Sequence, residues 1–358
     1  MTKKKIAVIN CFDSFKTRER LIAEVCVENN YEVIVVNSDF SHYEKRKIIQ
    51  DTYDLPNTTF LSVNTIPYKK NISFSRLISH YYFSKSVYRQ ICNIRPNAIY
   101  CIIPPNSLVK KLSLYKKRNP KTKLIFDIND MWPESFPFKN KFAMPFLNMW
   151  RKIRNKNIVH SNMIITECNL FKKELKRQNI KNEIQVVYYP DSKEQCIKKE
   201  CEIKDEINLC YIGSINNIID IDFIIKLLNA IKSMKNIYLH IIGGGEKETI
   251  LINKLNENQI QFHYYGKIYD EMEICKIIEK CQYGLNIMLE TVFVGLTMKS
   301  VKYFKYGLPI INNIYGDTND AINLFDLGFN VNKNNIKEIA NQIVHTKTNE
   351  YLAKRENV

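Results

Sequence analysis

The sequence predicts two doubly wound α/β domains in tandem, each built on a parallel sheet. Strand-like apolar runs alternate with helix-period segments along almost the whole chain. The apolar runs are continuous, which is typical of strands that are covered on both faces. With 358 residues, the chain also exceeds the size at which one hydrophobic core usually stops growing. We therefore expect two Rossmann-like domains, residues 1–190 and 191–358, that face a central cleft.

The first half alternates strands and helices up to a polar stretch. The predicted strands are Ile6–Ile9, Val33–Val36, Phe60–Val63, Ala98–Ile103, Lys123–Phe126, Met163–Thr166 and Ile184–Val187. The predicted helices are Thr17–Asn29, Phe74–Ile94, Leu108–Arg118 and Leu170–Gln178. The stretch "PDSKEQCIKKECEIKDE" then lacks apolar periodicity and indicates an interdomain linker.

A second alternating series follows the linker. Its predicted strands are Asn208–Ile212, Tyr238–Ile242, Gln261–Tyr264, Tyr283–Met288 and Leu308–Asn312. Its predicted helices are Ile221–Ser233, Lys247–Asn256, Glu271–Lys280, Lys299–Tyr306 and Ile336–Val344. Ligands of such sheets bind at the carboxyl ends of the strands, so the residues after each strand are the candidates for a site.

Charge is distributed unevenly between the two halves. Residues 1–190 hold 33 basic and 15 acidic residues, whereas residues 191–358 hold 20 and 22. A basic first half suits anionic lipid, a phosphorylated substrate or nucleic acid. No run approaches the length of a membrane span or a signal peptide, and none of the ten cysteines forms a C-x-x-C pair. We therefore expect reduced thiols and a cytoplasmic protein.

Glycines follow the 238–242 strand in "GGGEKE", which starts at Gly243. Glycine lets backbone N–H groups approach a ligand at a helix N-terminus, which favours an anion or a nucleotide. The stretch is not the dinucleotide fingerprint, because position 248 is glutamate. A glycine-rich turn without a ligand is the alternative.

The next strand leads into "YGKIYDEMEI". Gly266 permits a tight turn, Lys267 borders the cleft, and Asp270 can cap the following helix. A simple connection between a strand and a helix is the alternative.

The segment "TMKSVKYFKYGLPIIN" is predicted to form a loop, a short helix, a glycine stop and a buried strand. Lys299 and Ser300 lie in the first turn of this helix. Backbone N–H groups and a lysine at a helix start suit a diphosphate. An exposed surface lysine is the alternative for Lys299.

Three acids follow the 123–126 strand in "IFDINDMWPES". Asp127, Asp130 and Glu134 lie close together there, where Trp132 and Pro133 fix the turn. One of the acids could act as a general base or anchor a sugar hydroxyl. Helix capping and solvated charge are the alternative. The six histidines form no ligand cluster, so we expect no metal.

Taken in order, these segments resemble a GT-B glycosyltransferase, similar to family 4 enzymes of bacterial capsular and surface-polysaccharide synthesis. "DMWPES" resembles the D-L-W-P-E-S signature of one group of these enzymes, and "SNMIITECNLFKKELKRQNIKNEIQVVYYP" resembles the segment that closes their N-terminal domain. "YIGSI", "LHIIGGGEKE", "FHYYGKI" and "MKSVKYFKYGLPIIN" fall in the family's order and spacing. The resemblance covers most of the chain.

The resemblance implies a retaining transferase that moves a hexose or N-acetylhexosamine from a nucleotide sugar to a lipid-linked oligosaccharide. It implies a UDP-linked donor held by residues 191–358, an acceptor met by residues 1–190, and no cofactor or metal ion. A basic acceptor domain fits peripheral contact with the anionic inner face of the plasma membrane.

The resemblance also implies the site residues. Asp130 and Glu134 would orient the acceptor or the transferred sugar, and Lys299 would stabilise the departing diphosphate. The donor-binding residues expected are Gly213, Gly243, Gly244, Gly245, Gly266, Lys267, Thr297, Lys299, Ser300 and Lys302.

Four positions depart from the family's pattern. Ser214 and Ile219 replace the usual arginine and lysine, and Asn129 replaces a frequent histidine. Lys302 stands where a ribose-binding glutamate usually does. We therefore expect Lys299 to contribute most of the diphosphate binding. The acids to test for a ribose contact are Glu290, Asp317 and Asp320.

Two other functions stay open. The absence of the usual arginine, lysine and glutamate favours a non-catalytic GT-B partner subunit of a glycosyltransferase complex. A measurement of nucleotide binding would distinguish such a subunit from a transferase. Nucleic-acid binding through the basic half is the other, although the basic residues form no compact recognition motif.

Overall fold

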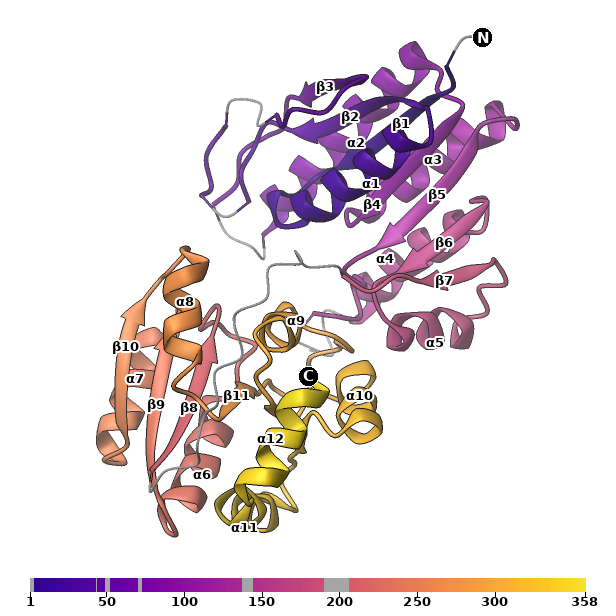
Figure 1. Cartoon of the computed structure of the whole chain (residues 1–358). Coiled ribbons are helices and arrows are strands. Elements are labelled where there is room, and N and C mark those ends of the chain that lie inside the picture. The colour runs from indigo at the N-terminus through magenta and orange to yellow at the C-terminus, as the bar shows by residue number, and fades with distance from the viewer. Residues whose placement is uncertain (1–2, 43, 49–51, 70–72, 137–143, 190–205) are drawn as a thin grey trace. The chain divides into compact units, whose positions relative to one another are not determined.

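The computed structural model describes residues 3–42, 44–48, 52–69, 73–136, 144–189 and 206–358. The chain divides into two compact units, Met1–Pro190 and Asp191–Val358 (Figure 1). Each unit holds one parallel sheet with helices packed on it, so the predicted fold class of two Rossmann-like α/β domains is confirmed. Almost all of the predicted linker lies outside the described residues.

The N-terminal sheet joins seven described strands in the order β3-β2-β1-β4-β5-β6-β7. Every neighbouring pair is parallel. The chain starts in the middle of the sheet, runs to one edge and then continues on the other side, as in a doubly wound fold. The strands are β1 (Lys5–Asn10), β2 (Glu32–Ser38), β3 (Thr58–Val63), β4 (Ala98–Ile103), β5 (Lys123–Ile128), β6 (Met163–Thr166) and β7 (Ile184–Val186).

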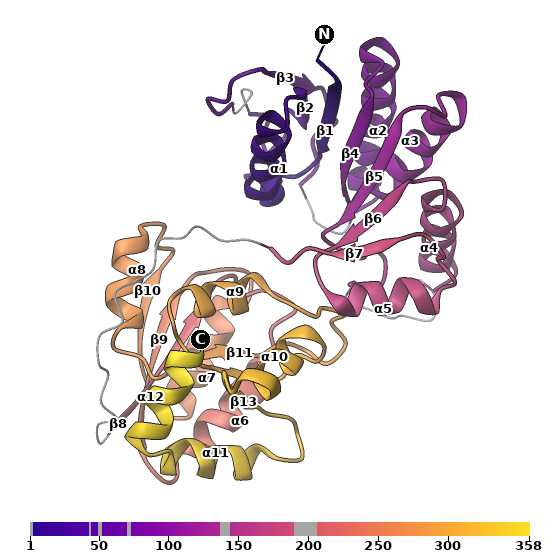
Figure 2. The same ribbon diagram turned by 45° about the vertical axis from the view of Figure 1, so that its right-hand side comes forward.

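Helices cover both faces of this sheet. Figures 1 and 2 show α1 on one side of the sheet and α2 and α3 on the other. Right-handed crossovers require this arrangement, because β1 to β2 and β3 to β4 cross the sheet in opposite directions. The helices are the short η1 (Asp13–Phe15), α1 (Lys16–Glu28), α2 (Phe74–Ile94), α3 (Asn106–Arg118), α4 (Met144–Ile158) and α5 (Asn169–Arg177).

The C-terminal sheet joins six described strands in the order β10-β9-β8-β11-β12-β13, again all parallel. Successive residues of β8 enter different hydrophobic clusters: Leu209 and Tyr211 enter one, and Cys210 and Ile212 the other. This alternation buries both faces of the strand. The strands are β8 (Glu206–Ile212), β9 (Asn236–Ile242), β10 (Gln261–Gly266), β11 (Tyr283–Asn286), β12 (Ile310–Asn312) and β13 (Gly328–Asn330).

Polar caps fix where several of the C-terminal helices begin. Asp220, Asp270 and Thr297 each accept a hydrogen bond from a backbone N–H in the first turn that follows. The predicted cap at Asp270 is therefore confirmed. The helices are α6 (Ile221–Lys232), α7 (Glu248–Glu257), α8 (Glu271–Ile278), α9 (Met298–Lys305), α10 (Asp317–Phe325), α11 (Ile336–His345) and α12 (Thr348–Asn357).

Five elements have no counterpart in the predicted series: η1, α4, α10, α12 and β13. α10 and α12 carry too many polar residues to show a clear apolar period, and β13 has only three residues. α4 mixes exposed Phe146 and Met149 with basic residues, so its buried stripe is narrow. Each of these elements depends on tertiary packing more than on local pattern.

Two expectations about the whole chain can be compared with the structure. Seven described cysteines are free thiols. Cys275 is disulfide-bonded, so the expectation of reduced thiols is wrong at that position. In the part of the chain that the structure describes, no helix is long and apolar enough to cross a membrane.

Candidate functional site

Lys299 lies in the first turn of α9, beside the carboxyl end of β8. The Thr297 side chain caps this helix by accepting a hydrogen bond from the Ser300 backbone N–H at 3.0 Å. The cap fixes the helix start, so that the Lys299 side chain runs over Gly213, the residue after β8. A Cβ built on Gly213 would lie 3.1 Å from Lys299 Cε. The predicted alternative of an exposed surface lysine is wrong, because Lys299 is only 9% exposed.

The partner of the buried ammonium group is an aromatic side chain. Lys299 Nζ donates a hydrogen bond to Tyr211 Oη at 2.6 Å and lies 4.0 Å from the centroid of the Tyr211 ring. Tyr211 Oη in turn donates to the Ser214 carbonyl at 2.8 Å. Among the described residues, no carboxylate pairs with Lys299. Burial lowers the pKa of Lys299 to about 7. The site therefore holds a cation without a counter-charge, which suits an anionic ligand.

The glycines after β8 and β9 serve close packing between two loops. The Gly213 N–H donates to the Ile242 carbonyl at 2.8 Å, and the Gly243 N–H donates to the Gly266 carbonyl at 2.7 Å. A Cβ on Gly243 would lie 2.0 Å from the Gly213 carbonyl oxygen, and one on Gly245 would lie 2.5 Å from the Ile215 carbonyl oxygen. The amides of Gly213 and Gly243 are thus engaged within the protein. The expectation that Gly213 and Gly243 bind the donor stays a prediction.

Gly244 lies among polar side chains that the sequence did not bring together. A Cβ there would lie 3.1 Å from Glu248 Oε2, 3.3 Å from Tyr264 Oη and 3.4 Å from Lys267 Cε. Burial, together with the hydrogen bond to Glu248, raises the pKa of Tyr264 to about 12. Lys267 is exposed and follows Gly266, whose φ of 69° requires the left-handed region. This edge of the sheet therefore carries an acidic side chain, a basic side chain and a phenol, namely those of Glu248, Lys267 and Tyr264.

Thr297 and Ser300 belong to a buried polar network. Thr297 Oγ1 donates to Asn286 Oδ1 at 3.0 Å, and Asn286 Nδ2 donates to Ser300 Oγ at 2.9 Å. Asn286 also donates to Asn312 at 2.8 Å, which links β11 to β12. Ser300 is fully buried. These hydroxyls position α9 on the sheet, and the expectation that Thr297 and Ser300 bind the donor stays a prediction. The sequence pattern did not single out Asn286 and Asn312.

The remaining charged candidates are spread over the domain. Lys302 is half-buried on α9. Glu290 accepts a hydrogen bond from Lys333 at 2.9 Å on the exposed surface. Asp317 is buried in the first turn of α10, whereas Asp320 is exposed. Ile219, at a position where the resemblance implies a lysine, packs into the hydrophobic core.

In the N-terminal unit, Asp127 is a buried structural anion. Arg18 donates to its two carboxylate oxygens at 2.5 and 3.0 Å, and Tyr100 Oη donates at 2.6 Å. Arg18 also donates to the Val187 carbonyl at 3.0 Å, so the ion pair joins α1 to β5 and the end of β7. The alternative of solvated charge is wrong for Asp127, which is fully buried.

Asp130 organises its own loop. Trp132 Nε1 donates to Asp130 Oδ2 at 2.5 Å, and Ser135 Oγ donates to Oδ1. Burial raises the pKa of Asp130, although these two donors oppose the shift. Both oxygens are engaged within the "DMWPES" turn. Asp130 therefore holds this turn, and the acceptor-orienting role expected for it stays a prediction.

Glu134 binds two arginines from α4. Arg154 donates to its two oxygens at 2.7 and 2.9 Å, and Arg151 Nε donates at 2.8 Å. Gln178 Nε2, just after α5, also donates at 2.8 Å. Burial acts to raise the pKa of Glu134, but the Arg154 guanidinium and the hydrogen bond from Gln178 together lower it. The carboxylate ties its loop to α4, and the catalytic role expected for Glu134 stays a prediction.

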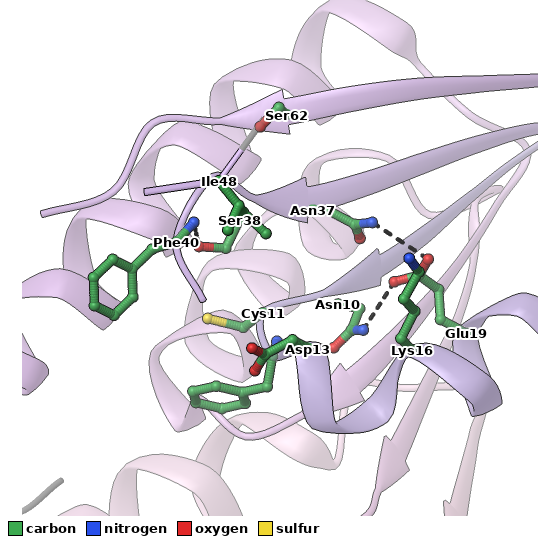
Figure 3. Close-up of a pocket in the computed structure, with 11 residues that line it drawn as sticks. Asn10, Cys11, Asp13, Lys16, Glu19, Asn37, Ser38, Phe40, Ile48 and Ser62 are labelled. Carbon is green, nitrogen blue, oxygen red and sulfur yellow. Dashed lines mark hydrogen bonds between the residues drawn. The ribbon is translucent and has the colours of Figure 1, made fainter. Parts of the chain in front are cut away.

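The N-terminal unit contains a small pocket, lined by polar and apolar side chains, at the carboxyl ends of β1, β2 and β3 (Figure 3). It encloses about 40 Å³, enough for one or two small polar groups. Asn10 Nδ2 donates to the buried Glu19 carboxylate at 2.8 Å, and Asn37 Nδ2 donates to the same carboxylate at 3.3 Å. Among the described residues, buried Asn37 Oδ1 has no hydrogen-bond partner. The pocket can therefore accept a hydrogen bond from a hydroxyl group.

Aromatic rings gather close to this pocket. The Trp132 ring stacks on His80 with centroids 5.5 Å apart, and Phe12 meets His80 edge-on at 5.4 Å. The Arg76 guanidinium lies 4.5 Å from the Trp132 centroid. Burial lowers the pKa of His80 well below its usual value, so this imidazole is neutral. No sequence pattern placed His80 and Arg76 beside Trp132.

Residues 206–349 match the family described as Glycosyl transferases group 1. No curated protein matches the sequence. Solved structures match nearly the whole chain. Sucrose-phosphate synthase from Thermosynechococcus elongatus has a TM-score of 0.71 at 11% identity, over 99% of this chain and 94% of that chain. The apo form of the lipopolysaccharide outer core galactosyltransferase WaaB has a TM-score of 0.59 at 15% identity, over 98% and 99%. Anabaena HepE in complex with UDP and glucose has a TM-score of 0.63 at 10% identity, over 99% and 94%.

The Glycosyl transferases group 1 segment contains Lys299, Tyr211 and all the glycines described above. The N-terminal unit lies outside this segment. The likeness to solved structures shows the GT-B fold, and with the family segment it supports a transferase enzyme. Within the described residues, no group of three or more histidine, cysteine, aspartate or glutamate side chains could hold a metal ion.

Proposed function

We propose that this chain is a retaining glycosyltransferase that moves a hexose or N-acetylhexosamine from a UDP-linked donor to a lipid-linked oligosaccharide in capsular or surface-polysaccharide synthesis. The Glycosyl transferases group 1 segment supports transfer from a nucleotide sugar. The UDP assignment is supported by the similar fold of HepE, which was solved with UDP and glucose.

The single observation that carries the proposal is the environment of Lys299. Burying a lysine without an acid is costly, so the cation needs a reason to be there. Tyr211 holds the ammonium group through a lone pair and a ring face, neither of which cancels its charge. A diphosphate beside Gly213 would supply the missing negative charge. As the bond to the sugar breaks, charge grows on the departing phosphate, and Lys299 would stabilise it.

The acceptor would be met by the N-terminal unit. Its small pocket presents the free Asn37 Oδ1 and the buried Glu19 carboxylate to hydroxyl groups. Asn37 would add an acceptor-orienting contact to those that the resemblance implies for Asp130 and Glu134. The excess of basic residues in 1–190 supports an acceptor carried on an anionic membrane surface.

The donor assignment can be tested with Lys299→Ala. UDP binding, measured by titration calorimetry, should weaken at least about tenfold, and turnover with a membrane extract should fall by roughly 10² or more. Lys276→Ala is the matched control, since Lys276 is an exposed lysine on α8 in the same unit. Near-normal turnover by a folded Lys299→Ala protein would contradict the proposal.

A non-catalytic partner subunit remains the second candidate. It is favoured by the internal engagement of Asp130 and Glu134 and by the lysine at 302. Calorimetry separates the two functions, because a partner subunit of this kind would bind no UDP and no nucleotide sugar. Binding of UDP that depends on Lys299 would exclude it.

A further inference from the structure

Three helices of the N-terminal unit carry basic residues and no acidic ones. α2, α3 and α4 together contain twelve lysine or arginine residues and no aspartate or glutamate. The sequence between Asp54 and Asp127 has no acidic residue at all. Surfaces of soluble proteins usually intersperse both signs of charge. An acid-free stretch of this length creates a field of one sign.

The three helices form one continuous surface. α3 packs against α2 on one side and against α4 on the other. Figures 1 and 2 place α2 and α3 on the face of the sheet opposite α1. The exposed basic residues on the three helices are Arg89, Lys110, Lys117, Arg118, Lys152 and Lys156. We call this surface, formed by α2, α3 and α4, the basic face.

Acids in the loops that follow do not neutralise the basic face. Between Asp54 and Glu167 the chain holds three acidic residues, Asp127, Asp130 and Glu134. Each of them gives its oxygens to hydrogen bonds or ion pairs inside the N-terminal unit. Of these three, Asp127 and Glu134 are buried.

Large apolar and aromatic side chains are exposed among the basic ones. Tyr81 and Tyr82 on α2 are 50% and 46% exposed, and Phe146 and Met149 on α4 are 41% and 51% exposed. Leu114 on α3 is exposed as well. Lys111 lies 5.6 Å from the centroid of the Tyr81 ring, so the charges and the rings interleave. This combination is typical of surfaces that lie in the interface of an anionic bilayer.

We propose that the basic face docks the N-terminal unit on an anionic phospholipid membrane. The lysines and arginines would lie at the headgroups, and the side chains of Tyr81, Tyr82, Phe146 and Met149 would enter the acyl boundary. Exposed Leu114 and Met149 favour a lipid partner over nucleic acid, because aliphatic side chains neither stack on bases nor pair with phosphates. The inference rests on the membrane contact of the proposed function and is independent of the donor site.

Co-sedimentation with vesicles tests the basic face. The full chain should bind vesicles that contain phosphatidylglycerol at low salt, bind them less at high salt, and bind phosphatidylcholine vesicles weakly. Changing four exposed lysines of the face to glutamate should reduce binding at least about tenfold, since each basic residue near an anionic surface contributes. These lysines are Lys110, Lys117, Lys152 and Lys156. Phe146→Ser with Met149→Ser should weaken binding that persists at high salt.

A matched variant controls for net charge. It changes four exposed lysines of the C-terminal unit to glutamate, namely Lys226, Lys276, Lys280 and Lys337. This control should bind vesicles like the unchanged chain. Equal loss in both variants, no vesicle binding by the unchanged chain, or tighter binding to RNA or duplex DNA than to vesicles at the same salt would overturn the proposal. UDP calorimetry on the same variants reports the donor site separately, so failure of one proposal is distinguishable from failure of the other.

Discussion

Lys299 Nζ and Tyr211 Oη lie 2.6 Å apart in the interior of the C-terminal unit, and the same ammonium group lies over the Tyr211 ring. The pair joins the start of α9 to the end of β8. It holds the Lys299 amino group in place, and when this group is protonated no described carboxylate cancels its charge. The predictions about the donor site follow from this relationship.

Tyr211→Phe should weaken UDP binding by about fivefold to tenfold, because the ammonium group loses one hydrogen bond, worth roughly 1 kcal/mol, while keeping the ring. Titration calorimetry measures the effect. Tyr283→Phe is the control, since Tyr283 is another buried tyrosine of the same sheet that packs against Phe329 and Tyr351. Unchanged UDP affinity in Tyr211→Phe would mean that the phenol does not position Lys299.

The affinity for UDP should depend on pH above neutrality. Lys299 binds a diphosphate as a cation, and burial places its pKa at about 7. The protonated fraction falls as pH rises through this value, so affinity should decrease between pH 7 and 9, by up to about tenfold per unit. Lys299→Arg should flatten the profile, because arginine stays charged throughout this range. A flat profile in the unchanged chain would show that Lys299 is not the titrating group.

Lys299→Met should stabilise the folded protein near pH 7. The folded pKa is depressed below the value of about 10.4 in an unfolded chain, so the unfolded state binds more protons between these values. The destabilisation caused by burying Lys299 is largest below pH 7 and disappears as pH approaches 10. Thermal unfolding should therefore show Tm raised by roughly 2 °C or more at pH 7, and less gain at pH 9.5. An equal gain at both pH values would exclude a charge effect.

Gly243→Ala and Gly266→Ala should differ sharply. A Cβ on Gly243 would lie 2.0 Å from a carbonyl oxygen, and its φ of 141° is strained for any side chain. A Cβ on Gly266 would have no described heavy atom within 4 Å, leaving only the left-handed φ of 69°. Gly266→Ala should cost about 1 kcal/mol, and Gly243→Ala clearly more. Denaturant unfolding measures the loss of unfolding free energy in each variant. Equal losses would contradict the close packing of the loop after β9 against the loop after β8.

Glu134→Gln should destabilise the N-terminal unit by about 3 kcal/mol, because Arg154 is left buried without its anion. The pKa of Glu134 is lowered, so the ion pair contributes above about pH 4 and is lost as pH falls through the folded pKa. The effect of Glu134→Gln should therefore shrink in acid. Glu24→Gln is the control, since Glu24 pairs with Arg20 on the surface and should cost under about 1 kcal/mol. Lost turnover at unchanged stability would instead support the catalytic role expected for Glu134.

The order of strands and helices could be predicted because continuous apolar runs mark parallel strands. The strand Ala98–Ile103 and the helix Phe74–Ile94 have the predicted bounds. α10 and α12 could not be predicted, because their polar sequences become helical only against the rest of the domain.

The candidate site could be predicted only in part. Lys299 was identified from its place at a helix start, yet nothing in the sequence showed that Tyr211 would hold it. Asp130 and Glu134 stood out as acids after a strand, but a sequence does not show that Arg154, twenty residues on, occupies one of them. Long-range pairing decides whether a carboxylate is available, and spacing along the chain does not reveal it.

The low pKa of Lys299 has a chemical consequence. Near neutral pH a large share of the molecules carry this side chain as an uncharged amine, and an uncharged amine is a nucleophile. Burial also lowers the pKa of Lys45 and Lys116, but the shift at Lys299 is larger. An aldehyde that carries a phosphate group would therefore form an imine at Lys299 in preference to the rest, and occupancy of the neighbouring space by a diphosphate would block the labelling.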